Sequence, residues 1–224
     1  MFNRKDVVFL AATLAMLSSC QLQPETPLTA AAGRGDTAEV ESILDRGAPV
    51  DELGGHGLTA LIAAARGGHI DTIRLLLHEG ADPNRAAGVN DWTPLMHAIH
   101  KEQSGSVEAL LDGGAKVNAR GRRGLTALIM AAGYGYASII QILLEKGADP
   151  YAETADGANA LTAAVTGVMD IDRFTAGDCQ AGAVNALLKR APELKLKWSP
   201  LVRLAGLSAK ADGCSTVARL LEGH

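Results

Sequence analysis

Apolar residues recur along this chain in triplets that have the spacing of one helical face. Within each triplet the residues stand at positions i, i+3 and i+4, which lie on the same side of an α-helix. The steps between successive triplets are 33, 34 and 33 residues, so the pattern predicts one amphipathic helix in each of several equivalent units. The triplets are Val40/Ile43/Leu44, Ile73/Leu76/Leu77, Val107/Leu110/Leu111 and Ile140/Leu143/Leu144.

A second landmark predicts another helix earlier in each unit. Thr is a favoured N-cap and Pro is favoured at the first helical position. The five occurrences, the last with Asn in place of Thr, are Thr26-Pro27-Leu28, Thr59-Ala60-Leu61, Thr93-Pro94-Leu95, Thr126-Ala127-Leu128 and Asn159-Ala160-Leu161. After each triplet a glycine supplies the left-handed residue that ends the second helix, and these positions are Gly47-Ala48, Gly80-Ala81, Gly114-Ala115 and Gly147-Ala148. Each unit is therefore predicted to be a pair of helices.

The pattern becomes irregular toward the C-terminal end. In the fifth unit 28 residues separate Asn159 from Leu187, where earlier units use 17, so the difference of eleven residues is an insertion within 165–180. A sixth, degenerate unit follows, with Ser199-Pro200-Leu201 at its helix start and Val217, Leu220 and Leu221 as its triplet. Terminal repeats of a solenoid are commonly irregular because one of their faces meets solvent.

These residues resemble the ankyrin-repeat family over residues 26–194, with a degenerate capping repeat over 195–224. The resemblance implies an all-α repeat solenoid, in which helix-turn-helix units are joined by β-hairpin fingers. In one respect the chain departs from the family, whose Thr-Pro-Leu is followed by His. The corresponding residues here are Thr29, Ile62, Met96, Ile129 and Thr162, so we expect looser hydrogen bonding between adjacent turns.

Residues 1–19 have the form of an export signal, with Arg4 and Lys5 before a short apolar run. That run is too short for a membrane span, which needs about 20 residues. Leu17-Ser18-Ser19-Cys20 resembles the lipobox of bacterial lipoproteins. The resemblance implies cleavage before Cys20, a lipid on its thiol and a short tether over residues 20–25. The alternative is an ordinary secreted protein in which Cys20 has no special role.

The lipoprotein resemblance also implies a location in the bacterial envelope. Gln21, rather than Asp, follows the cysteine, which in lipoproteins favours sorting to the outer membrane. We therefore expect a lipid-anchored protein that faces the periplasm. Two cysteines, Cys179 and Cys214, then remain in an oxidising compartment, where an even number favours a disulfide. The alternative is two free thiols.

Composition and motifs argue against catalysis and against nucleic-acid binding. The net charge is −4, whereas nucleic-acid binding calls for a basic excess. We find no phosphate-binding loop, nucleophile elbow or set of paired zinc ligands. His97 and His100 stand one helical turn apart, but a metal site needs three or four ligands. We expect no enzyme activity, no cofactor, no bound metal and a monomer.

The ankyrin resemblance implies that partners bind a groove lined by the fingers and the ends of the first helices. Carried onto this chain, the groove positions are Arg34, His56, Arg66, Asn90, Trp92, His100, Lys101, Arg120, Arg122, Arg123, Tyr134, Glu153 and Asp156. Six of them are Arg or Lys and two are acidic, so the groove is predicted to be basic and its partner to present an acidic face. Arg, Trp and Tyr are also enriched in binding hot spots.

The function expected from these features is stoichiometric binding of another protein at the membrane. One concrete form is an immunity protein that inhibits a periplasm-acting toxin or lipase. The alternatives are a scaffold that protects or localises a periplasmic enzyme, and a binder of anionic lipid or envelope polysaccharide.

Overall fold

The structure, a computed structural model, describes residues 25–88, 90–167 and 180–196. The expected export signal, Cys20, Cys179, Cys214, most of the insertion and the sixth unit lie outside these residues. Within them the chain forms five helix pairs, which are α2 (Pro27–Arg34) with α3 (Thr37–Asp45), α4 (Ala60–Gly67) with α5 (Ile70–His78), α6 (Pro94–His100) with α7 (Ser104–Asp112), α8 (Ala127–Tyr134) with α9 (Ala137–Glu145), and α10 (Ala160–Thr166) with α11 (Ala181–Arg190).

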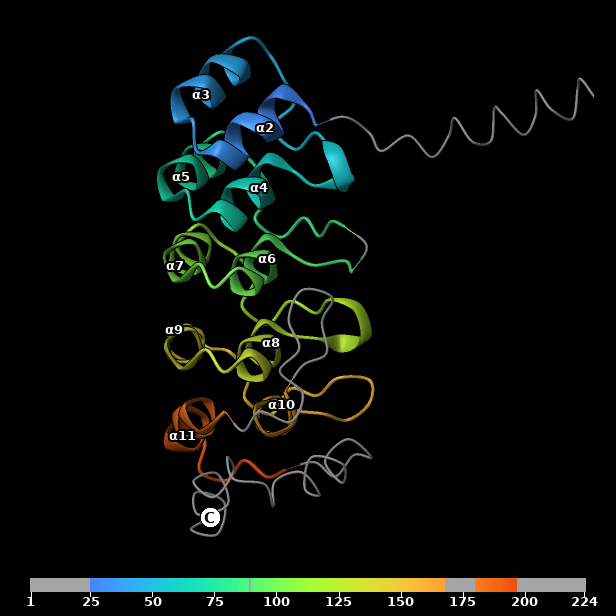
Figure 1. Ribbon diagram of the computed structural model, residues 1–224, viewed down its shortest axis with the longest axis vertical. Coiled ribbons are helices and arrows are strands. Elements are labelled where there is room, and N and C mark those ends of the chain that lie inside the picture. The colour runs from blue at the N-terminus through green and yellow to red at the C-terminus, as the bar shows by residue number, and fades with distance from the viewer. Residues whose placement is uncertain (1–24, 89, 168–179, 197–224) are drawn as a thin grey trace, which may run out of the picture.

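The pairs stack into an elongated solenoid (Figure 1). The first helices of the pairs form one row, from α2 to α10, and the second helices form a parallel row, from α3 to α11. The connections that run from one pair to the next project on the side of the first row as fingers. The predicted helical repeat solenoid is therefore confirmed.

Each first helix begins where the local chemistry predicts it. The side-chain oxygen of Thr59 accepts a hydrogen bond from the backbone N–H of Ile62 at 3.3 Å, and Thr26, Thr93, Thr126 and Asn159 make the equivalent bond. This bond satisfies one of the backbone donors that a helix N-terminus leaves without a partner. The second helices are followed by Gly47, Gly80, Gly114 and Gly147, all at positive φ, as predicted.

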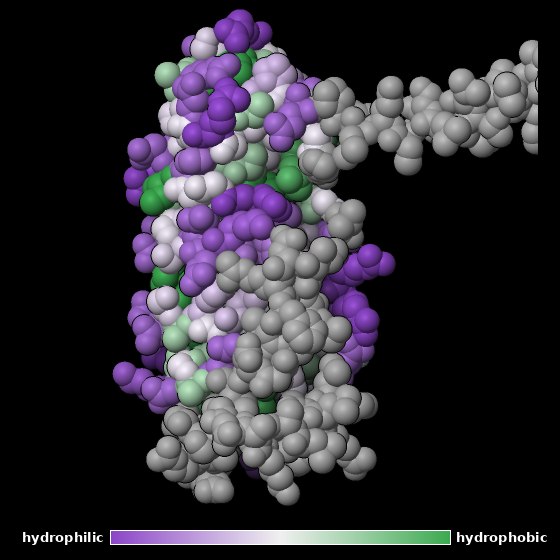
Figure 2. Space-filling model, viewed as in Figure 1, coloured by the Kyte–Doolittle hydropathy of each residue, from purple (hydrophilic) through white to green (hydrophobic). Residues whose placement is uncertain are grey.

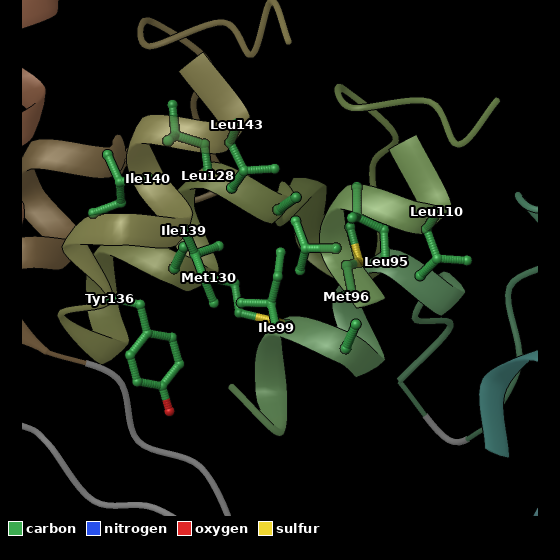
Figure 3. Packing of buried hydrophobic residues seen from close by; sticks show 14 of the residues in the cluster. Leu95, Met96, Ile99, Leu110, Leu128, Met130, Tyr136, Ile139, Ile140 and Leu143 are labelled. Carbon is green, nitrogen blue, oxygen red and sulfur yellow. The ribbon is translucent and has the colours of Figure 1, made fainter. Parts of the chain in front are cut away.

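The hydrophobic core runs continuously between the two rows. Leu61, Leu95, Leu128 and Leu161, the leucines of the repeated Thr/Asn-x-Leu landmark, are at most 1% exposed. Figure 3 shows how side chains from successive pairs interlock, with Leu95, Met96 and Ile99 of α6 beside Leu128 and Met130 of α8. Small alanines on the first helices, among them Ala31, Ala64 and Ala98, are fully buried. They allow the helices to approach closely enough for this packing.

The fingers are shorter than regular β-hairpins. In the described residues the β pairing consists of two isolated bridges, Ala87 with Trp92 and Arg120 with Thr126. The two other fingers each close with a single backbone hydrogen bond, from the N–H of Gly54 to the carbonyl of Leu58 at 2.8 Å and from the N–H of Thr154 to the carbonyl of Ala158 at 2.9 Å. Asparagine side chains also join successive turns, because Asn118 donates to the carbonyl of Gly147 at 3.1 Å and accepts from the N–H of Asp149 at 2.9 Å.

The fifth pair differs from the others in the connection between its helices. Two or three residues separate the helices of the first four pairs, whereas α10 ends at Thr166 and α11 begins at Ala181. The insertion predicted from the sequence therefore lies between these two helices. Among the residues that the structure describes, no helix is both long enough and apolar enough to cross a membrane.

Candidate partner-binding face

The residues predicted to bind a partner lie at two places on the solenoid. Arg34, Arg66, His100, Lys101 and Tyr134 lie at or next to the C-terminal ends of the first helices. The other eight lie in the fingers. We call the thirteen together the candidate face. Hydrophilic residues protrude at the finger that carries the short helix η2 (Arg122–Gly124), and others form a band over α4 and α6 (Figure 2).

The residues of the candidate face differ in exposure. His100 and Tyr134 are buried, with 4% and 7% of their surface exposed, so they support the face from beneath. The exposed residues are Arg34, Arg120, Arg122, Arg123 and Asp156. The half-buried residues are Arg66, Asn90, Trp92, Lys101 and Glu153. The side chain of His56 is outside the described part of the chain.

Several positive charges of the candidate face are already engaged within the molecule. Nη2 of Arg123 lies 2.6 Å from both carboxylate oxygens of Asp156, and Nη2 of Arg34 lies 2.6 Å from a carboxylate oxygen of Glu39. Arg120 donates to the backbone carbonyl of Glu153 at 2.8 Å. Of these contacts, only the pair with Glu39 brings a negative charge from outside the candidate face and so reduces the basic excess that the residue types alone predicted.

Aromatic rings form a continuous row across the third and fourth repeats. The ring of Trp92 lies 5.5 Å from that of His97 and 5.2 Å from that of His100. His100 continues the row to Tyr134 at 5.9 Å, and Tyr134 to Tyr136 at 5.4 Å. Nδ1 of His100 also lies within hydrogen-bond distance of the Tyr134 hydroxyl, at 2.9 Å. These spacings are those of favourable aromatic pairs, so the row is a rigid base for the half-buried Trp92.

His97 is a member of this row that the family positions did not include. It is 5% exposed, and burial is the main reason that its pKa falls from 6.5 to about 4. The charges of Arg66, His100 and Lys101 lower the pKa further, while the hydrogen bond to Ala87 opposes the shift. His97 is therefore neutral at pH 7.

The hydrogen bonds of neutral His97 define its tautomer. Nε2 faces the carbonyl of Ala87 at 3.4 Å and must carry the proton, so Nδ1 accepts from Nη1 of Arg66, also at 3.4 Å. A signal for this role was present in the sequence. The equivalent positions in the other repeats are Ala30, Ala63, Met130 and Ala163, so a histidine is exceptional there.

The described residues of the candidate face include no set of metal ligands. In the described ranges no three His, Cys, Asp or Glu side chains gather closely enough to hold an ion. Its groups are mostly cations, aromatic rings and hydrogen-bond donors, which are suited to binding a surface of another molecule.

Comparison with known proteins identifies the repeat. The sequence profile described as "Ankyrin repeats (3 copies)" matches residues 6–87, 57–121 and 84–154. The first match begins inside the segment expected to be an export signal, although Thr26 is the first landmark in register.

Individual relatives are similar over the repeats only. The chain is 42% identical over 127 residues to the ankyrin repeat and KH domain-containing protein mask-1 of Caenorhabditis elegans, covering 56% of this chain and 5% of that protein. It is 38% identical over 104 residues to an ankyrin repeat-containing protein of Treponema pallidum, covering 46% of this chain and 35% of the relative.

The similarity to a human protein has the same extent. Ankyrin repeat and SOCS box protein 6 of Homo sapiens is 39% identical over 111 residues, covering 46% of this chain and 26% of that protein. These matches span only a minor part of each relative, and what they share with this chain is the repeat itself. With its profile match over residues 6–154 and the five helix pairs of its described residues, this chain belongs to the ankyrin-repeat family, whose members generally mediate protein–protein interactions.

Proposed function

We propose that this protein binds another protein through the candidate face while a lipid on Cys20 tethers it to the periplasmic side of a bacterial membrane. The observation that carries the binding role is the aromatic row. It places a half-buried Trp92 on a base of packed rings, with cationic side chains on both sides along the solenoid. A rigid aromatic residue next to arginine is the composition of an interface hot spot.

The tether rests on the sequence alone. Leu17-Ser18-Ser19-Cys20 follows a basic start and an apolar run, and two or three acyl chains hold a protein at a membrane far better than one. A tethered binder meets its partner at the high effective concentration that a membrane surface provides. The concrete role that we propose is immunity, in which the protein inhibits a toxin or lipase that acts in the periplasm.

Binding to anionic lipid or polysaccharide is less well supported. Such a surface is held by several cations at once, and the ion pairs Arg34–Glu39 and Arg123–Asp156 neutralise two of the six cations of the candidate face. Proteins, in contrast, can use the aromatic row as well as the charges.

One capture experiment tests both parts of the proposal. The full-length protein, tagged at its C-terminus, is expressed in a bacterial host, crosslinked and purified from membrane and soluble fractions. We expect the wild type in the membrane fraction with one stoichiometric partner, and Cys20→Ser in the soluble fraction. Charge reversal of Arg120, Arg122 and Arg123 should leave the protein at the membrane and reduce partner recovery about tenfold or more.

The control is Arg74→Glu, which alters an exposed arginine on α5, in the second row of helices. It should keep the partner. Membrane association of Cys20→Ser would contradict the tether. Equal recovery with the triple variant would contradict binding at the fingers.

A further inference from the structure

Arg66 differs from the other arginines of the candidate face in what it contacts. It lies in the last turn of α4 and is half-buried. Its hydrogen bond runs to Nδ1 of His97, and no carboxylate within the described residues pairs with it. Arg34 and Arg123, by comparison, are held by Glu39 and Asp156. Arg66 therefore keeps its full positive charge at a place that is partly shielded from water.

His97 orients this charge without neutralising it. A neutral imidazole accepts one of the five N–H donors of a guanidinium and leaves four for other acceptors. His97 is itself fixed, because Nε2 faces the carbonyl of Ala87 and the Trp92 ring packs against its edge at an interplanar angle of 67°. The guanidinium is thus held by a buried group, which lowers the entropy that a ligand must overcome when it binds.

Trp92 provides apolar surface next to the same histidine. Its ring contacts both His97 and His100, yet it remains half-buried rather than buried. Arg66 and Trp92 therefore stand on a common support, one offering charge-assisted hydrogen bonds and the other an apolar ring. We call Arg66, Trp92 and His97 the Arg66 site.

We infer that the Arg66 site is the hot spot of the candidate face and that it takes an Asp or Glu side chain of a protein partner with an apolar side chain beside it. The carboxylate would accept hydrogen bonds from Arg66 in bidentate geometry, while the apolar neighbour packs on Trp92. This inference rests on the proposed binding of a protein at the candidate face. It narrows the expected partner surface from a generally acidic face to one Asp or Glu side chain with an apolar side chain beside it. A single cation beside an aromatic ring suits such a pair better than it suits a charged lipid surface.

Peptide selection tests the inference and does not require the natural partner. A display library of random twelve-residue peptides is selected against the immobilised full-length protein, and the enriched sequences are resynthesised. We expect enrichment of Asp or Glu next to Leu, Phe or Trp. Replacing that acid with its amide in the peptide should weaken binding to the wild type about tenfold or more, as expected for a charge-assisted hydrogen bond.

The protein variants identify the residue that binds the acid. Arg66→Gln should weaken binding of the acidic peptide by the same factor and should no longer distinguish it from its amide, because the two changes remove one interaction. Arg66→Lys should retain part of the preference for the acid, since it keeps the charge but not the bidentate geometry. Arg74→Gln is the control, because it removes an exposed arginine on α5, outside the candidate face, and it should bind like the wild type.

The outcomes separate this inference from the proposed function. Enriched peptides that bind without an acid, or an acid preference unaffected by Arg66→Gln, would overturn the Arg66 site and leave protein binding by the candidate face intact. A library that yields no binder would count against both. Thermal unfolding checks that each variant is folded, and the comparison of acid with amide on the wild type remains decisive if Arg66→Gln does not fold.

Discussion

At the scale of single residues, the most informative feature is a buried histidine that takes the place of alanine. Ala30, Ala63 and Ala163 occupy the equivalent positions in three other repeats. His97 fills the space between a finger and α6, and in doing so it links the carbonyl of Ala87 to the guanidinium of Arg66. A single histidine, at a position where three other repeats have alanine, thus connects two adjacent units and supports Trp92.

This histidine makes the stability of the fold depend on pH. Its pKa in the folded protein is about 4, against 6.5 for an unperturbed histidine. Below pH 6.5 the unfolded chain binds a proton that folded His97 does not, so the free energy of unfolding falls until about pH 4 and then levels off. The whole contribution is of the order of 3 kcal/mol.

Urea denaturation of wild type and His97→Gln between pH 7.5 and 3.5 measures this contribution. The carboxylates titrate in both proteins, so the difference between their free energies of unfolding reports on His97 alone. As the pH falls from 6.5 to 4, the free energy of unfolding of the wild type should fall relative to that of the variant. A difference that stays constant with pH would show that His97 is not buried in its neutral form. Arg66, His100 and Lys101 are the charged or titratable groups that act on it, and all three are kept in the variant.

At the scale of helices and fingers, hydroxyl caps determine where the first row begins. Thr59 is 1% exposed and its oxygen accepts the N–H of Ile62. Thr59→Ala should lower the free energy of unfolding by about 1–2 kcal/mol, because it leaves that buried donor without a partner.

The comparison with serine separates the cap from packing. Thr59→Ser keeps the oxygen and loses only a methyl group, so urea denaturation should find it less destabilised than Thr59→Ala. Equal losses in the two variants would assign the effect to the methyl group instead of the hydrogen bond.

The helices could be predicted from sequence because their signals are local. Thr93 caps an amide three residues away, and Gly114 ends a helix by its own backbone conformation, so neither depends on the angle between repeats. The contacts within the candidate face could not be predicted in this way, since they join residues of neighbouring units. The pairs Arg123–Asp156 and His100–Tyr134 lie 33 and 34 residues apart, and only the stacking of the units brings them together.

At the scale of the whole solenoid, cohesion depends on side chains that bridge neighbouring turns. Asn84 donates to the carbonyl of Gly114 at 3.4 Å and accepts from the N–H of Lys116 at 2.7 Å. Asn118 repeats this arrangement one unit later. The next equivalent residue is Tyr151, which is 54% exposed and cannot make the two bonds of an amide. In the part of the chain that the structure describes, the junction between the fourth and fifth pairs therefore lacks the asparagine bridge found at the two preceding junctions.

Because each unit of a solenoid contacts only its neighbours, a junction that lacks this bridge lets the units beyond it open separately. Native-state hydrogen exchange should find amides of α10 and α11 less protected than those of α6 to α9. Asn118→Ala removes the bridge one junction earlier, so α8 and α9 should then open together with α10 and α11. Asp112→Asn is the control at the same junction, because it removes an exposed ion pair with Lys146 that contributes little. Protection that is uniform from α6 to α11, or that Asn118→Ala lowers equally in every helix, would mean that the solenoid opens as one unit and that the asparagine bridges do not set its boundaries.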